Sequence, residues 1–86
     1  MRKYKIVITD SENKRIKEWK EYHADTAKDA AKIIKDAKRG DLDQIELCEW
    51  SALISEYRTR LRISPDWVSF VNGVAIAKEI RDAALS

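Results

Sequence analysis

His23 is the only histidine of this chain and Cys48 its only cysteine, so these two side chains are the first candidates for chemistry. A thiolate activated by a nearby imidazole is an effective nucleophile. Cys48 also falls in the first turns of a segment predicted below to be helical, where the helix dipole favours the thiolate. The structural alternative makes Cys48 a core or boundary residue and His23 the end of a strand. We favour this alternative and predict no catalytic residue.

Metal and cofactor sites need combinations of residues that the sequence does not supply. One histidine and one cysteine are too few for a structural zinc site. The carboxylates do not follow the spacing of a calcium-binding loop. With only Gly40 and Gly73, the chain has no glycine-rich phosphate-binding motif. We therefore expect no metal, no small-molecule cofactor and no enzymatic activity.

Basic residues offer a possible nucleic-acid surface. Arg58, Arg60 and Arg62 alternate along one segment, and Arg15 and Lys17 lie in the N-terminal part of the chain. Such residues can contact phosphates, and Trp19 could stack on a base. The net charge of +2 is small, however, and acidic residues ahead of the arginines would complement a helix dipole. Nucleic-acid binding is therefore the alternative hypothesis.

Aromatic residues favour a protein partner. Three tryptophans are many for a core built from 86 residues, and Trp19 stands among charged neighbours, including Lys17 and Lys20. Exposed Trp, Tyr and Arg dominate the energetics of protein interfaces. We predict a small protein that binds and modulates another macromolecule through Trp19, Lys17, Lys20 and Tyr57. Inhibitors and adaptors have this size, as do anti-defence proteins of phages and mobile elements.

Composition predicts one compact globular domain over residues 1–86. Apolar residues make up 44% and charged residues 37% of the chain. The longest uncharged run, 67–77, is too short to cross a bilayer, so no membrane partner is expected. The N-terminal residues lack a secretory apolar segment, and a single cysteine cannot form an intrachain disulfide. These features predict a cytoplasmic protein, located in the host cytoplasm if it is phage-encoded.

The N-terminal segment predicts a β-hairpin. Residues 3–9 alternate between apolar and polar, as a half-buried strand does, and residues 10–14 are polar and turn-forming. Residues 15–23 complete the hairpin as a second strand, although their apolar residues also have helical spacing. A lone hairpin has two unpaired edges. Strand pairing with another chain follows as a hypothesis, and a homodimer is its simplest form.

Two helices are predicted after the hairpin. Residues 26–39 have an apolar side, a cap at Asp25 or Thr26, an acid three residues after Thr26 and Gly40 at the end. Residues 41–62 are predicted to be the longest helix, capped by Asp41 and stopped by Pro65. Its apolar stripe comprises Leu47, Trp50, Leu53, Ile54, Tyr57 and Leu61. The alternative is a strand over 57–63, where apolar residues and arginines alternate.

The C-terminal segment carries conflicting signals. Ser64, Pro65 and Asp66 resemble a helix start, and residues 74–84 are rich in helix formers. We predict helix over 65–84 with a break at Asn72–Gly73, and keep a hairpin or a lone strand at 67–71 as the alternative. The predicted fold is α+β: an N-terminal antiparallel hairpin, then two or three helices with the central one longest, and a C-terminal segment with a β alternative.

Overall fold

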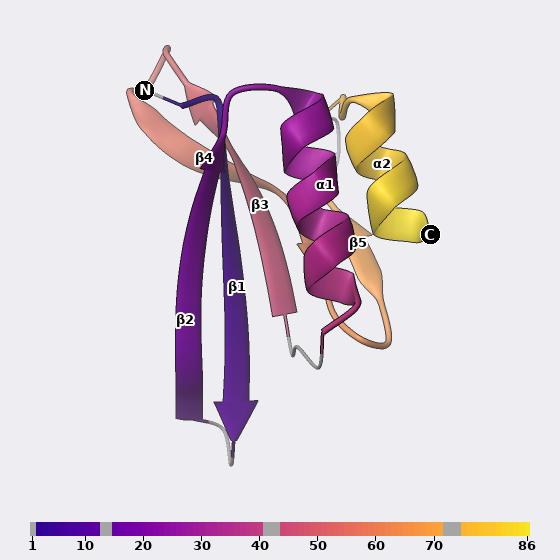
Figure 1. The fold of residues 1–86 in the computed structure, drawn as a ribbon. Helices are drawn as coiled ribbons and strands as arrows, with labels where there is room; N and C mark the ends of the chain where they lie inside the picture. Colours follow the sequence, from indigo (N-terminus) through magenta and orange to yellow (C-terminus); the bar gives the residue numbers. More distant parts are fainter. Residues whose placement is uncertain (1, 13–14, 41–43, 72–74) are drawn as a thin grey trace.

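The computed structural model of the chain describes residues 2–12, 15–40, 44–71 and 75–86. A five-stranded antiparallel sheet in the order β2-β1-β3-β4-β5 carries two helices on one of its faces (Figure 1). The elements, in chain order, are β1 Tyr4–Glu12, β2 Arg15–Ala24, α1 Ala27–Lys38, β3 Gln44–Ser51, β4 Glu56–Ile63, β5 Val68–Phe70 and α2 Lys78–Leu85. None of the helices described is long and apolar enough to cross a membrane.

The N-terminal hairpin is present and longer than predicted. β1 pairs with β2 from Tyr4 opposite Ala24, and a β-bulge interrupts the register beyond Asp10. β1 lies between β2 and β3 in the sheet, because its other edge pairs with β3. Figure 1 shows that the turn end of the hairpin extends well past the ends of both helices.

Helix α1 follows the predicted capping. The Thr26 hydroxyl accepts a hydrogen bond from the Asp29 amide at 3.2 Å, which satisfies one free amide of the first turn. At the other end, the Gly40 amide donates to the Ala37 carbonyl. The buried side of α1 consists largely of alanines, so its backbone can lie close to the sheet and to α2.

The core lies between the sheet and the two helices. Ile6 on β1 stands opposite Leu47 on β3, and Leu47 stands opposite Leu61 on β4. All three are fully buried, as are Ile34 of α1 and Ile80 of α2. Complete burial of such a side chain is worth about 1.5–3 kcal/mol. This row of side chains therefore holds three strands and both helices together.

The predicted fold is wrong in its centre, because residues 44–62, most of the predicted central helix 41–62, do not form a helix. Gln44–Ser51 is strand β3, and Glu56–Ile63 is strand β4. The proposed cap Asp41 lies outside the described residues. The alternation of apolar and charged residues in 57–63 was the correct signal, and it extends back to Ile45 and Leu47. Pairing with β1 and between the two strands satisfies the backbone of both and overrides the helical spacing.

The predicted apolar stripe is correspondingly divided among three environments. Leu47 and Leu61 belong to the core, whereas Leu53 lies in the β3–β4 turn and is 95% exposed. Ile54 in the same turn is also exposed, and Ser55 there has a positive φ of 54°. Trp50 and Tyr57 stand opposite each other beside the turn. The stripe does not lie on a single surface.

The C-terminal prediction is wrong for residues 65–71 and 75–77, which are not helical, and correct for the helix near the end. Ser64 and Trp67 exchange backbone hydrogen bonds, so Pro65 and Asp66 form a two-residue turn rather than a helix start. The lone-strand alternative is correct, because β5 pairs with β4. Helix α2 begins at Lys78. The predicted break at 72–73 lies outside the described residues.

Two leucine substitutions distinguish the sheet from the predicted helix. Leu47→Ala removes a fully buried side chain and should lower the free energy of unfolding by about 2–5 kcal/mol. Leu53→Ala changes an exposed turn residue and should alter it by less than about 0.5 kcal/mol. Urea denaturation measures both. Equal losses would contradict the structure, since both leucines would lie on the buried stripe of a helix.

Candidate binding surface on the open face of the sheet

One face of the sheet is covered by α1 and α2, and we call the opposite one the open face. Residues opposite each other across antiparallel strands point to the same side. Val7 stands opposite Glu21 and Glu46, and Glu46 stands opposite Arg62, so these four lie on the open face. In Figure 1, both helices lie on the other side. Continuing the alternation adds Lys5, Thr9, Trp19, His23, Gln44, Cys48, Trp50, Tyr57 and Thr59.

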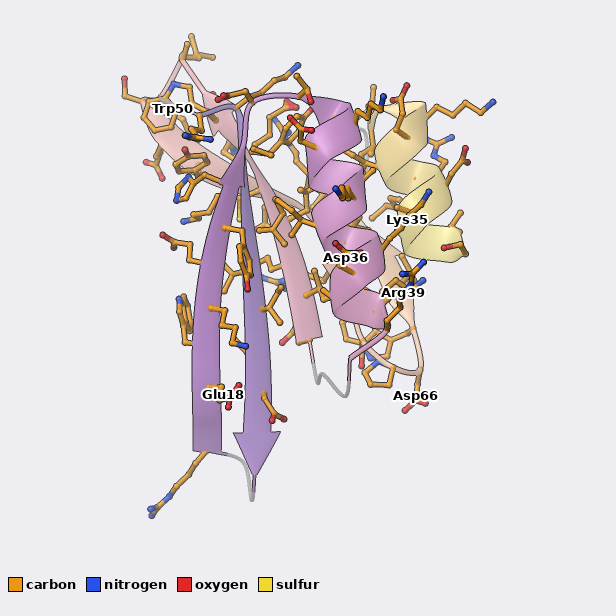
Figure 2. All side chains as sticks on the ribbon, viewed as in Figure 1. Glu18, Lys35, Asp36, Arg39, Trp50 and Asp66 are labelled. Carbon is orange, nitrogen blue, oxygen red and sulfur yellow. The ribbon has the colours of Figure 1, made fainter. Side chains whose placement is uncertain are left out.

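Three rings from three strands meet at one end of the open face, and we call them the aromatic cluster: His23, Trp50 and Tyr57. The Trp50 and Tyr57 rings pack edge to face with their centroids 5.1 Å apart, and the His23 ring lies 5.8 Å from that of Tyr57. The Lys5 ammonium lies 4.9 Å from the centre of the Tyr57 ring. Figure 2 shows Trp50 at the end of the sheet far from the hairpin turn. Trp50 and Tyr57 are only half-buried.

Polar contacts fix the orientation of this cluster. The Tyr57 hydroxyl donates to the Arg2 carbonyl at 2.8 Å and lies 3.3 Å from Nδ1 of His23. Nε2 of His23 lies 3.3 Å from a Glu21 carboxylate oxygen. Tyr57 is thus held by contacts with three other segments, and its ring is presented in a defined position. A preorganised aromatic side chain loses little conformational entropy when it is covered.

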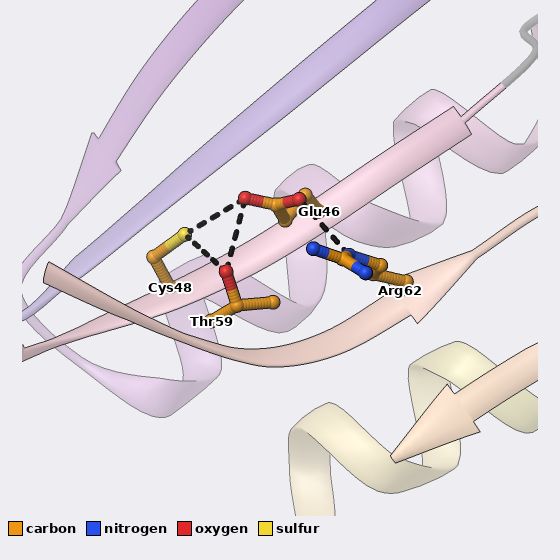
Figure 3. A network of polar contacts seen from close by, with 4 residues as sticks. All are labelled: Glu46, Cys48, Thr59 and Arg62. Carbon is orange, nitrogen blue, oxygen red and sulfur yellow. Dashed lines mark hydrogen bonds and ion pairs between the residues drawn. The ribbon is translucent and has the colours of Figure 1, made fainter. Parts of the chain in front are cut away.

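Glu46 is the centre of a second polar group on the open face (Figure 3). One carboxylate oxygen accepts from the Thr59 hydroxyl at 3.1 Å and from the Cys48 thiol at 3.5 Å. The other accepts from Nε of Arg62 at 3.2 Å. β3 and β4 are thereby joined by side chains as well as by their backbone ladder. The arginine that could offer a positive charge on this part of the face is already paired.

Cys48 is placed as a structural residue. Its side chain is buried among its open-face neighbours, and burial raises the pKa of the thiol above its usual value. Cys48 lies on a strand, so no helix dipole stabilises a thiolate. Lys5 on β1 stands between Cys48 and His23. Two strand spacings separate the thiol from the imidazole by roughly 10 Å, which is beyond hydrogen-bond reach.

The residues predicted for protein binding are not brought together. Trp19 stands opposite Thr9 on the open face and is 60% exposed. Lys20 is exposed but points to the opposite side, because it stands opposite Ile8. Tyr57 of β4 contacts His23 of β2 in the aromatic cluster, whereas Trp19 lies four residues from His23 along β2, towards the hairpin turn. The backbone of Lys17 is in β2, and its side chain lies outside the described part of the structure.

The arginines predicted for nucleic-acid binding do not form one basic patch. Arg58 stands opposite Glu49 and is exposed. Arg60 lies 3.8 Å from a carboxylate oxygen of Glu49, and its Nε atom is buried without a partner among the described residues. Arg62 is paired with Glu46 as described above. Arg15 is exposed at the turn end of β2, far along the sheet from β4.

The sequence did not single out Glu46 or His23 as parts of a surface. His23 was weighed only as a partner of Cys48, and Trp50 was assigned to a buried stripe. The sequence did contain a pattern that indicates a strand here. Glu46, Cys48 and Trp50 alternate with the core residues Ile45 and Leu47 up to the bulge. Recognising that the segment is a strand would have placed them on the second face.

A hollow of about 740 Å³ lies elsewhere, at the C-terminal ends of both helices. Its apolar lining includes Ile63 and Trp67. Lys38 on its rim is already engaged, because its ammonium donates to the Ala84 carbonyl at 2.8 Å. That contact satisfies a free carbonyl of α2 and links the two helices. The described lining of the hollow is mixed, because Gln44, Ser64 and Asp66 accompany its apolar residues.

No protein-family model, curated protein or solved structure matches the chain. Among the residues that the structure describes, no group of three or more His, Cys, Asp or Glu side chains could hold a metal ion.

The raised thiol pKa predicts how Cys48 affects stability with pH. The folded state retains the proton to higher pH than the unfolded state, where the thiol pKa is about 8.5. The stabilisation of wild type over Cys48→Ala, about 1 kcal/mol at pH 7, should be constant below pH 8. It should fall as the pH rises above about 8.5, by at most about 1.4 kcal/mol per pH unit.

Urea denaturation of both proteins from pH 6 to pH 10 measures this difference. Titration of lysines and tyrosines that do not interact with the thiol affects both proteins alike and cancels in the comparison. A stability difference that stayed constant, or grew with pH, would contradict the placement of the thiol in a desolvated site.

Proposed function

We propose that this chain is a small, non-enzymatic protein that binds and modulates a protein partner through the open face of its sheet. The observation that carries the proposal is the aromatic cluster, in which Tyr57 is held by a hydrogen bond and packs against Trp50, and yet both rings remain half-exposed on an uncovered face. Trp and Tyr are the residues that contribute most when such a surface is covered by another protein.

The charge on the open face supports a protein rather than a nucleic-acid partner. Arg62 pairs with Glu46, and Lys5 lies between β2 and β3 strands that carry Glu21 and Glu46. A phosphate-binding surface needs several cations that are free to replace counterions. Mixed charges around an aromatic centre are instead typical of protein interfaces. The partner that fits this surface is a polypeptide segment with an apolar side chain that packs against the aromatic cluster. Polar groups of the segment would surround that side chain.

The same proposal includes a cytoplasmic location. Cys48 is a free, buried thiol, and small proteins that fold in oxidising compartments usually depend on several disulfides.

Affinity capture with matched tryptophan variants tests the proposal. The tagged chain is cross-linked in nuclease-treated lysate from its source cells as wild type, Trp50→Ala and Trp67→Ala. Trp67 is a suitable control because it is exposed but lines the hollow rather than the open face. Urea denaturation first confirms that both variants fold. A captured protein supports the proposal only if, once purified, it binds wild type and Trp67→Ala equally and Trp50→Ala at least about 30-fold more weakly by calorimetry.

Two results would contradict the proposal. One is the absence of any purified partner whose affinity depends on Trp50. The other is binding to a DNA or RNA oligonucleotide, measured by fluorescence anisotropy, that weakens steeply between 50 and 200 mM salt. If that binding were also lost when Arg58, Arg60 and Arg62 are replaced by alanine, the nucleic-acid alternative would be correct.

A further inference from the structure

The outer edge of β2 is the long free edge of the sheet. The strand order places β2 and β5 at the edges, and β5 has three residues whereas β2 has ten. An edge strand offers a row of unpaired N–H and C=O groups to another strand, and shortness is one way that proteins protect an edge. β5 has that protection and β2 does not. α1 packs against β1 and β2, but the part of β2 towards the hairpin turn extends beyond both helices, which leaves its outer edge clear there (Figure 1).

The side chains of β2 also favour association along its outer edge, because two of them expose apolar surface. Trp19 is 60% exposed on the open face, and Tyr22 is exposed on the other face, where it stands opposite Ile6. Figure 2 shows Glu18, next to Trp19, on the part of the hairpin that extends beyond the helices. A strand added along this edge would therefore cover apolar surface on both faces of the sheet without meeting α1 or α2.

The sequence of β2 is complementary to itself in one antiparallel register. Alternate residues of a strand direct their backbone groups to the same edge, so two copies of β2 can pair symmetrically only with a residue opposite its own copy at the centre. With Trp19 at the centre, Glu18 stands opposite the second copy's Lys20, and Lys20 opposite the second copy's Glu18. The next position sets Lys17 opposite Glu21, at the bulge where the regular ladder ends.

Neighbouring symmetric registers are less favourable. Centres at Glu18, Lys20 or Glu21 would place two like charges directly opposite each other, which destabilises a cross-strand pair. A centre at Tyr22 would leave only five residues of overlap before β2 ends at Ala24. The register centred on Trp19 is the one that combines a long overlap with opposite charges on both sides of the centre.

We propose that the chain forms a homodimer in which β2 pairs with β2 of a second copy, centred on Trp19, to make a continuous ten-stranded sheet. The two-fold axis runs perpendicular to the sheet, so both open faces lie on the same side. The proposed dimer does not depend on the proposed function. If that function holds, the dimer presents two aromatic clusters to one partner or one assembly, and binding gains avidity.

Charge reversal with rescue tests the dimer and its register. Sedimentation equilibrium from about 10 μM to 1 mM gives the dimer dissociation constant. Glu18→Lys and Lys20→Glu each replace two attractive pairs by repulsive ones and should each weaken the dimer at least about tenfold. The double variant Glu18→Lys/Lys20→Glu should restore it. An equimolar mixture of the two single variants should also associate, because each then meets the opposite charge. Lys32→Glu, on the exposed side of α1, is the control and should change nothing.

A wild-type chain that stays monomeric over the whole range would overturn the proposal. A dimer that is indifferent to both reversals, or that the double variant fails to restore, would overturn the register. Neither result bears on the open face, because Trp50-dependent binding is measured separately with the purified partner, and Trp50 lies on β3 and not on β2.

Discussion

The row formed by Ile6, Leu47 and Leu61 is the contact on which the rest of the structure depends. It joins three strands from distant parts of the chain, and Ile34 and Ile80 cover it from the two helices. Once these three residues point inward, strand geometry forces their neighbours to the opposite side. The packing of the core therefore determines which residues lie on the open face.

With helices on one side only, the sheet must present a second face that tolerates water. The chain meets this requirement by pairing its charges and hydrogen-bonding groups across strands, as Glu46 does with Thr59 and Arg62. Small or short side chains such as Cys48 are covered by their neighbours. The exceptions are Trp50, Tyr57 and Trp19, which remain accessible although burying these rings would be energetically favourable. Accessible aromatic residues on an otherwise neutral and internally paired surface are the basis for our proposal that this face recognises a protein.

Local signals in the sequence were enough for the first half of the fold. The alternation of residues 3–9 and the Thr26 cap each depend on neighbours in the chain, and the hairpin and α1 follow them, although residues 10–12 of the predicted turn 10–14 belong to strand β1. The segment 41–62 could not be decided in this way. Its apolar residues fit a helical spacing, and the spacing was favoured because Leu53 and Ile54, which occupy a turn, completed the stripe. What selects the strands is pairing with β1, a contact between distant residues that no local pattern reports.

The same limit applies to the candidate site. Trp19 was correctly expected to reach the surface, since charged neighbours on both sides are a local signal. The aromatic cluster was not foreseen, because His23, Trp50 and Tyr57 come from three strands and meet only through the register of the sheet. The arginines suggested a patch for a similar reason: their acidic partners Glu46 and Glu49 are distant in sequence and adjacent in space.

Nuclear Overhauser effects from a uniformly labelled sample test the central row most directly. The structure predicts contacts between the methyl groups of Leu47 and those of both Ile6 and Leu61, with backbone cross-strand contacts between Ile45 and Ile63. A helical pattern over 44–61, with contacts between each residue and the third one along and none from Leu47 to Ile6, would contradict it.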